Sequence, residues 1–157
     1  MENIILSGML DEFRNKHSLQ GEKDDSLFEK FSNYCILKND HYDSFDFEKV
    51  STGQCVGVDG LAVSINGILV DDIDEATSLT QSQFDAKFIF VQTKTSASFD
   101  MGDYLKFINT IKAFFGPSEQ AVPNELITRF RIKNRIFAQA AKMRSLPDIS
   151  APYIYAG

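Results

Sequence analysis

Cysteine and histidine are both scarce in this sequence. Its 157 residues include only Cys35 and Cys55, and only His17 and His41. Two thiols cannot make a four-cysteine zinc site, and so few histidines argue against histidine-rich zinc chemistry. Without a disulfide framework, the two cysteines indicate a reducing compartment, so we expect the protein in the cytoplasm.

Long apolar runs and a basic leader are absent as well. No run approaches the roughly 18 residues that a membrane span requires, and the N-terminal stretch MENIILSGMLDEF lacks the basic region of a signal peptide. We therefore expect no membrane partner. The length predicts a single domain over residues 1–157, because domains usually have about 100–200 residues. A content of 43% hydrophobic and 24% charged residues is typical of a globular protein.

Basic residues are fewer than acidic residues in this chain, and many of them lie near its C-terminal end. The net charge of −6 argues against a domain that coats nucleic acid through bulk charge, although it does not exclude an enzyme that holds a phosphodiester through metal ions. Residues 125–148 hold six of the 16 Lys and Arg residues and only two acids. Arg129, Arg131, Lys133 and Arg135 are therefore candidates for a surface that faces DNA. The alternative is an ordinary solvated helix face.

Periodic apolar residues predict an α/β protein. Helical spacing favours helices over residues 3–19, 26–38, 98–115 and 123–146, and strand patterns cover residues 55–65, 68–70 and 87–95. Asn66-Gly67 predicts a hairpin between the first two strands, and the acidic stretch 71–75 is expected to be a polar connection. The last residues, APYIYAG, resemble the start of another strand. From them we expect a longer protein that continues beyond Gly157.

Asp59, Gln92 and Lys94 are the candidates for chemistry. Strand alternation places Asp59 in an apolar row, where an unpaired carboxylate is costly, so it needs a cation unless it lies in water at the strand end. Gln92 and Lys94 share one face at the end of a later strand. In a hydrolytic site Asp59 would bind a divalent cation, Gln92 would add an amide oxygen, and Lys94 would orient water or stabilise phosphate charge. Glu29, on the preceding helix, would be a further ligand. The alternative is a plain Asp59–Lys94 ion pair, with Glu29 in solvent.

This order of motifs resembles the PD-(D/E)xK nuclease superfamily. The resemblance rests on Phe28-Glu29 in a helix, Val58-Asp59-Gly60 before a hairpin, and FVQTK at residues 90–94. It covers residues 26–116 and is closest to the Mrr-like branch, in which Gln replaces the acid before the Lys. Two segments of the sequence are similar to the N-terminal part of AIPR (abortive phage infection) proteins: VGVDGLAVSINGILV and, after it, FIFVQTKTSASFDMGDYLKF.

The resemblance implies a restriction-endonuclease-like αβββαβ core, with a mixed central sheet flanked by helices. It implies that Asp59, Gln92, Lys94 and Glu29 are catalytic, and that Asp59, Gln92 and Glu29 hold Mg²⁺ or Mn²⁺. The implied activity is Mg²⁺-dependent hydrolysis of DNA phosphodiesters in defence against phage. DNA, the C-terminal remainder of the chain and a second copy of the chain are the expected partners.

Two other functions fit the same residues. A catalytically inactive nuclease fold would bind nucleic acid or support protein assembly, with salt-sensitive DNA binding through the basic helix. A protein-interaction domain without nucleic acid would suit the acidic composition. Against the second of these, an interaction domain has no reason to place Asp59, Gln92 and Lys94 at one end of a sheet.

Overall fold

Helices and strands alternate along the chain in a computed structural model that describes residues 3–39 and 46–156. The main elements are α1 (Ile4–Lys16), α2 (Asp24–Asn39), β1 (Gly60–Ile65), β2 (Ile68–Leu69), α3 (Ile73–Leu79), β3 (Ala86–Lys94), α4 (Met101–Phe115), α5 (Ile127–Ala138), β4 (Asp148–Ser150) and β5 (Tyr153–Tyr155). Asp40, expected just beyond the second helix, and Gly157 lie outside the described residues. The predicted α/β class is confirmed.

Five strands form one mixed sheet around β3. β1 runs antiparallel to β2 and β3, whereas β4 and β5 run parallel to β3. β4 pairs with residues 87–89 of β3 and β5 with residues 92–94, so the two short strands continue along the same side of β3. The interruption falls at Pro152, which has no N–H to donate but accepts the Gln92 N–H through its carbonyl at 3.2 Å.

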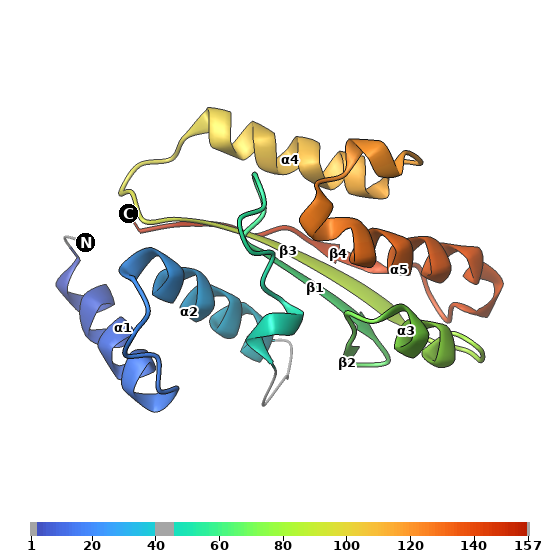
Figure 1. Ribbon diagram of the computed structural model, residues 1–157, viewed down its shortest axis with the longest axis horizontal. Coiled ribbons are helices and arrows are strands. Elements are labelled where there is room, and N and C mark those ends of the chain that lie inside the picture. Colours follow the sequence, from blue (N-terminus) through green and yellow to red (C-terminus); the bar gives the residue numbers. More distant parts are fainter. Residues whose placement is uncertain (1–2, 40–45, 157) are drawn as a thin grey trace.

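The predicted hairpin between β1 and β2 is confirmed. Asn66 and Gly67 have φ angles of 53° and 78°, the left-handed conformation that a two-residue hairpin turn requires. All six residues of β1 are buried, although the sequence pattern alternates. They are buried because helices cover both faces of the sheet (Figure 1).

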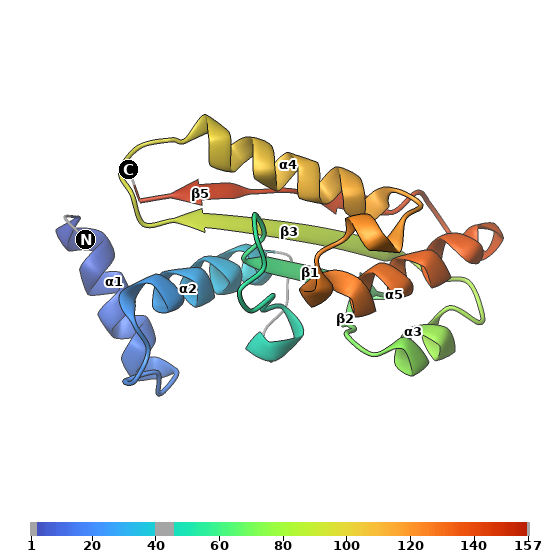
Figure 2. The same ribbon diagram turned by 45° about the horizontal axis from the view of Figure 1, so that its top comes forward.

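The two faces of the sheet have separate helical covers. α4 and α2 lie on opposite sides of β3, with α1 outside α2 (Figure 2). On one face, Phe88 and Phe90 pack with Phe107 and Phe114 of α4. On the other face, Ile89 and Val91 pack with Leu37 of α2. The aromatic stripe in residues 104–115 is therefore core packing.

Three expected elements differ from the structure. The strand expected over residues 55–65 begins only at Gly60, so Asp59 precedes it. The acidic stretch 71–75 is no simple connection: α3 begins within it, because the Asp72 carboxylate accepts the N–H groups of Asp74 and Glu75 and caps the helix. The expected helix over 123–146 is shorter, because α5 covers only Ile127–Ala138. The chain then turns so that the carbonyl of Lys142 and the N–H of Arg144 bond to Phe84 and lead into β4.

Candidate active site

A polar cavity of about 200 Å³ lies where β3 leaves the sheet. Its lining comes from α2, from the residue before β1 and from the end of β3: Asp25, Glu29, Asp59, Thr93, Lys94 and Thr95. Three of the four predicted catalytic residues, Glu29, Asp59 and Lys94, therefore meet in one cavity. The fold brings them together by pairing β1 with β3 and by laying α2 across β3.

Asp59 is held at the junction of β1 and β3. Its N–H donates to the carbonyl of Val91 at 2.8 Å. Its Oδ2 accepts two hydrogen bonds from Thr93, one from the backbone N–H at 2.8 Å and one from the hydroxyl at 2.9 Å. Burial raises the pKa of Asp59, while the two Thr93 donors and the charge of Lys94 oppose that rise.

Glu29 faces the same cavity in an unfavourable environment for a charge. Its pKa is raised to about 7, first by burial and then by the negative charges of Asp59 and Asp25. Lys30 acts in the opposite direction. A carboxyl group poised near neutrality beside a second carboxylate is typical of functional sites.

Gln92 does not line this cavity. Its side chain is 4% exposed, and strand alternation places it on the face of Phe90, under α4. Its Oε1 is buried and has no hydrogen-bond partner. A buried acceptor without a partner costs about 1–3 kcal/mol.

Lys94 makes an ion pair that the sequence analysis did not predict. Its Nζ lies 3.1 Å from Oδ2 of Asp103, on the first turn of α4. Among the ion pairs of the described residues, a plain Asp59–Lys94 pair, the alternative for these two side chains, is absent, and Lys94 pairs with Asp103 instead. Asp103 was missed because it lies on another element, although the spacing of Asp100 and Asp103 signals the start of a helix.

The four basic residues of α5 do not form one open surface. Arg129 and Lys133 are 7% and 4% exposed, and they donate to the carbonyls of Ser51 and Gly116. The ammonium of Lys133 also lies 4.0 Å from the ring centroid of Phe130. The other two basic residues are engaged as well, Arg131 by Glu119 and Arg135 by the hydroxyl of Thr80. Their alternate burial follows from helical periodicity, which turns only one side of α5 to solvent.

The carboxylate oxygens around the cavity are hard donor atoms, the type of ligand that Mg²⁺ and Mn²⁺ prefer. Glu29 and Asp59 are two carboxylates in one cavity, and their mutual repulsion is what a cation would relieve. Gln92, expected as a third ligand, does not line the cavity. Over residues 3–39 and 46–156, however, no group of three or more His, Cys, Asp or Glu residues is arranged to hold a metal ion.

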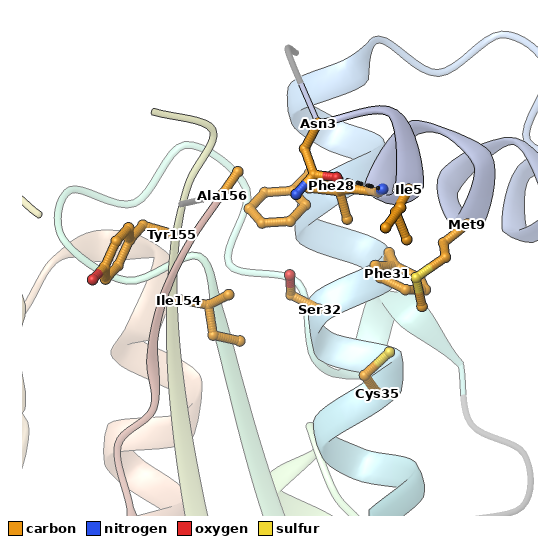
Figure 3. Close-up of a pocket in the computed structure, with 11 residues that line it drawn as sticks. Asn3, Ile5, Met9, Phe28, Phe31, Ser32, Cys35, Ile154, Tyr155 and Ala156 are labelled. Atoms are coloured by element: carbon orange, nitrogen blue, oxygen red, sulfur yellow. Dashed lines mark hydrogen bonds between the residues drawn. The ribbon is translucent and has the colours of Figure 1, made fainter. Parts of the chain in front are cut away.

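A second cavity, of about 390 Å³, lies between α1, α2 and β5 (Figure 3). Apolar side chains dominate its lining, including Met9, Phe28, Phe31 and Ile154, with Ser32 and Cys35 between them. Among the described residues that line it there is no carboxylate or lysine. The candidate catalytic side chains that carry charge, Glu29, Asp59 and Lys94, therefore all line the polar cavity and not this one.

Comparison with known proteins adds no relative. No family model, no curated protein and no solved structure matches this chain. Among the helices of the described residues, none has the length and apolar character to cross a membrane.

Proposed function

We propose that this chain is a metal-dependent DNA endonuclease domain with a restriction-endonuclease-like core. The observation that carries the proposal is the meeting of Glu29, Asp59 and Lys94, from three separate segments, in one cavity. Paired acids and an ammonium are the side chains that metal-assisted phosphodiester hydrolysis uses. A role in phage defence rests on the sequence resemblance alone.

The order of the elements supports this core. Read along the chain, α2, β1, β2, β3, α4 and β5 follow the αβββαβ pattern. α3 is inserted between the second and third strands, and α5 with β4 lies between the last helix and the last strand. The polar cavity is at the end of β3, where this pattern gathers its catalytic groups.

Each residue at the site has a separate task. Asp59 and Glu29 would hold Mg²⁺ or Mn²⁺ through their carboxylate oxygens, without Gln92, which lies outside the cavity. When bound, such an ion supplies positive charge for the phosphate and a more acidic water. Lys94 keeps its ammonium at the rim of the cavity, where it would donate to a phosphate oxygen. Thr93 orients the Asp59 carboxylate.

A DNA cleavage assay with Mg²⁺ or Mn²⁺ tests the proposal. Asp59→Asn and Lys94→Ala should each lower the rate by about 100-fold or more. Asp74→Asn and Lys112→Ala change exposed residues on other surfaces and should cut as the parent does. Mn²⁺ should also raise the Tm of the parent but not that of Asp59→Asn, because only the parent holds the ion. Cleavage by both site variants at the parental rate would refute the proposal.

The second candidate is a catalytically inactive nuclease-fold module that binds nucleic acid or supports assembly. Two observations favour it: Gln92 lies outside the cavity, and Lys94 is already paired with Asp103. It predicts no cleavage with either metal, and DNA binding that weakens steeply with salt. Because Arg129 and Lys133 are buried, reversal of charge at Arg131 and Arg135 is the informative test. Unchanged DNA affinity in that double variant would argue against the module.

A further inference from the structure

An ion pair joins the end of β3 to the first turn of α4. Nζ of Lys94 lies 3.1 Å from Oδ2 of Asp103, and the two side chains are 33% and 31% exposed. Partial shielding from water makes the attraction stronger than that of an open surface pair. Lys94 also lines the polar cavity, whereas Asp103 does not. Asp103 therefore binds the Lys94 ammonium from outside the cavity.

The position of Asp103 is set by α4 itself. Asp100 caps the helix, and its Oδ1 accepts the Asp103 N–H at 2.8 Å. A carboxylate in the first turn is further stabilised by the positive end of the helix dipole. The backbone of Asp103 is thus fixed independently of Lys94, as a residue that positions another requires.

Lys106 is a second cation near the Asp103 carboxylate, and it lies close to the other carboxylate oxygen. Nζ of Lys106 lies 3.8 Å from Oδ1 of Asp103, and the Lys106 side chain is 65% exposed. Asp103 therefore lies between one ammonium at the cavity and one in solvent. If Lys94 turned toward a phosphate, Asp103 would keep a cationic partner in Lys106.

We infer that Asp103 is a positioning residue that holds the Lys94 ammonium beside the cavity and releases it to a phosphate of bound DNA, with Lys106 as the replacement cation. The inference rests on the proposed nuclease function. It makes Asp103 and the substrate phosphate competitors for one ammonium. Removal of the Asp103 charge should therefore favour substrate binding.

Acylation of lysine side chains, followed by peptide mass spectrometry, tests the ion pair without any need for activity. An amine held by a carboxylate reacts slowly with an acylating reagent. In Asp103→Asn, labelling of Lys94 by acetic anhydride should be about threefold faster or more than in the parent, with exposed Lys112 as the internal standard. Asp74→Asn is the matched control, because Asp74 also lies in a first turn and its N–H bonds to the capping Asp72.

Cleavage kinetics test the competition. Asp103→Asn should lower KM about fivefold through loss of the competing charge and leave kcat close to that of the parent, because Lys94 has already left Asp103 when DNA is bound. Lys106→Ala should raise KM with kcat unchanged, since release of Lys94 then leaves Asp103 unpaired. A merely structural role would not split KM and kcat in this way.

The two proposals fail in different ways. If the parent cuts DNA while Asp103→Asn leaves both the labelling of Lys94 and the KM unchanged, the positioning role is overturned and the nuclease function stands. If the parent cuts no DNA, the nuclease function is overturned. Faster labelling of Lys94 in Asp103→Asn would then support the holding role alone.

Discussion

The Thr93 side chain and backbone both donate to the same oxygen of Asp59. The N–H lies 2.8 Å and the hydroxyl 2.9 Å from Oδ2. The residue between Gln92 and Lys94 therefore fixes the acid at the start of β1. These two bonds also lower the pKa of Asp59, against the rise that burial causes.

Thr93→Val should show how much the hydrogen bond from the Thr93 hydroxyl contributes, apart from the bond made by the Thr93 backbone N–H. Valine keeps the shape and the backbone N–H but removes one hydrogen bond to a carboxylate in a buried position. We expect a loss of about 1–2 kcal/mol in the free energy of unfolding, measured by urea denaturation at neutral pH. Thr93→Ser keeps the hydroxyl and should retain most of the bond's contribution. Equal stability of Thr93→Val and the parent would mean that water replaces the hydroxyl without cost.

Glu29 should make stability fall as pH rises. Burial, followed by repulsion from Asp59 and Asp25, raises its pKa from 4.5 to about 7. The folded state then binds the proton more tightly than the unfolded state, so its contribution is fully present below pH 4.5 and is lost as pH rises through about 7.

Glu29→Gln should remove this dependence. After a reduction for partial exposure, we expect the variant to gain about 1–2 kcal/mol over the parent between acidic and slightly alkaline pH. The measurement is urea denaturation of both chains across that range with a chelator present. Glu12→Gln, at an exposed position of α1, is the matched control. Parallel curves for Glu29→Gln and the parent would contradict the raised pKa.

Gly60→Ala should push α2 away from β1. A Cβ at this position would collide with the side chain of Asn33, which lies one helical turn after Glu29. The crowding should cost about 1–3 kcal/mol and weaken Mn²⁺ binding by moving Glu29 from Asp59. Adding Asn33→Ala removes the obstacle, and because Oδ1 of Asn33 has no hydrogen-bond partner, the double variant should recover stability.

Gly8→Ala is the control for that substitution. Nothing lies within 4 Å of the added Cβ, so α1 should gain about 0.5–1 kcal/mol from the better helix former. If Gly60→Ala proved as harmless as Gly8→Ala, the close contact between α2 and β1 would be wrong.

Two basic residues of α5 should differ sharply in their effect on stability. Lys133→Ala removes a hydrogen bond to Gly116 and a contact with the ring of Phe130, which should cost about 2 kcal/mol. Arg131→Ala changes an exposed side chain and should leave the urea midpoint close to that of the parent. An equal loss in both variants would show that Lys133 is not the interior group that the structure describes.

Local patterns predicted most of the elements. The stripe in α4 repeats at helical spacing and ends at Gly116-Pro117, so both its buried side and its end could be predicted from neighbours in the chain. The turn at Asn66-Gly67 is equally local, because it depends on two residues that tolerate positive φ. The acidic start of α3 was misinterpreted because capping aspartates also occur in loops.

The site was predictable only in part. Strand pairing made a meeting of Asp59 with the end of β3 a reasonable expectation, and the structure places Asp59 and Lys94 in one cavity with Glu29. The partner of Lys94 was not predictable, because Asp103 reaches it from a different layer of the fold. The burial of Arg129 and Lys133 was not predictable either, because a count of charges does not show which side of a helix packs against the core.

Local patterns in the chain by themselves determined most of the helices, the hairpin and the buried central strand, because such features depend on residues a few positions apart. Only the tertiary structure decided which charges share a cavity, which acid holds Lys94, and which bases of α5 turn inward. These outcomes depend on distances between elements remote in the chain. Desolvation and Coulomb energies act over those distances, and no local pattern specifies them.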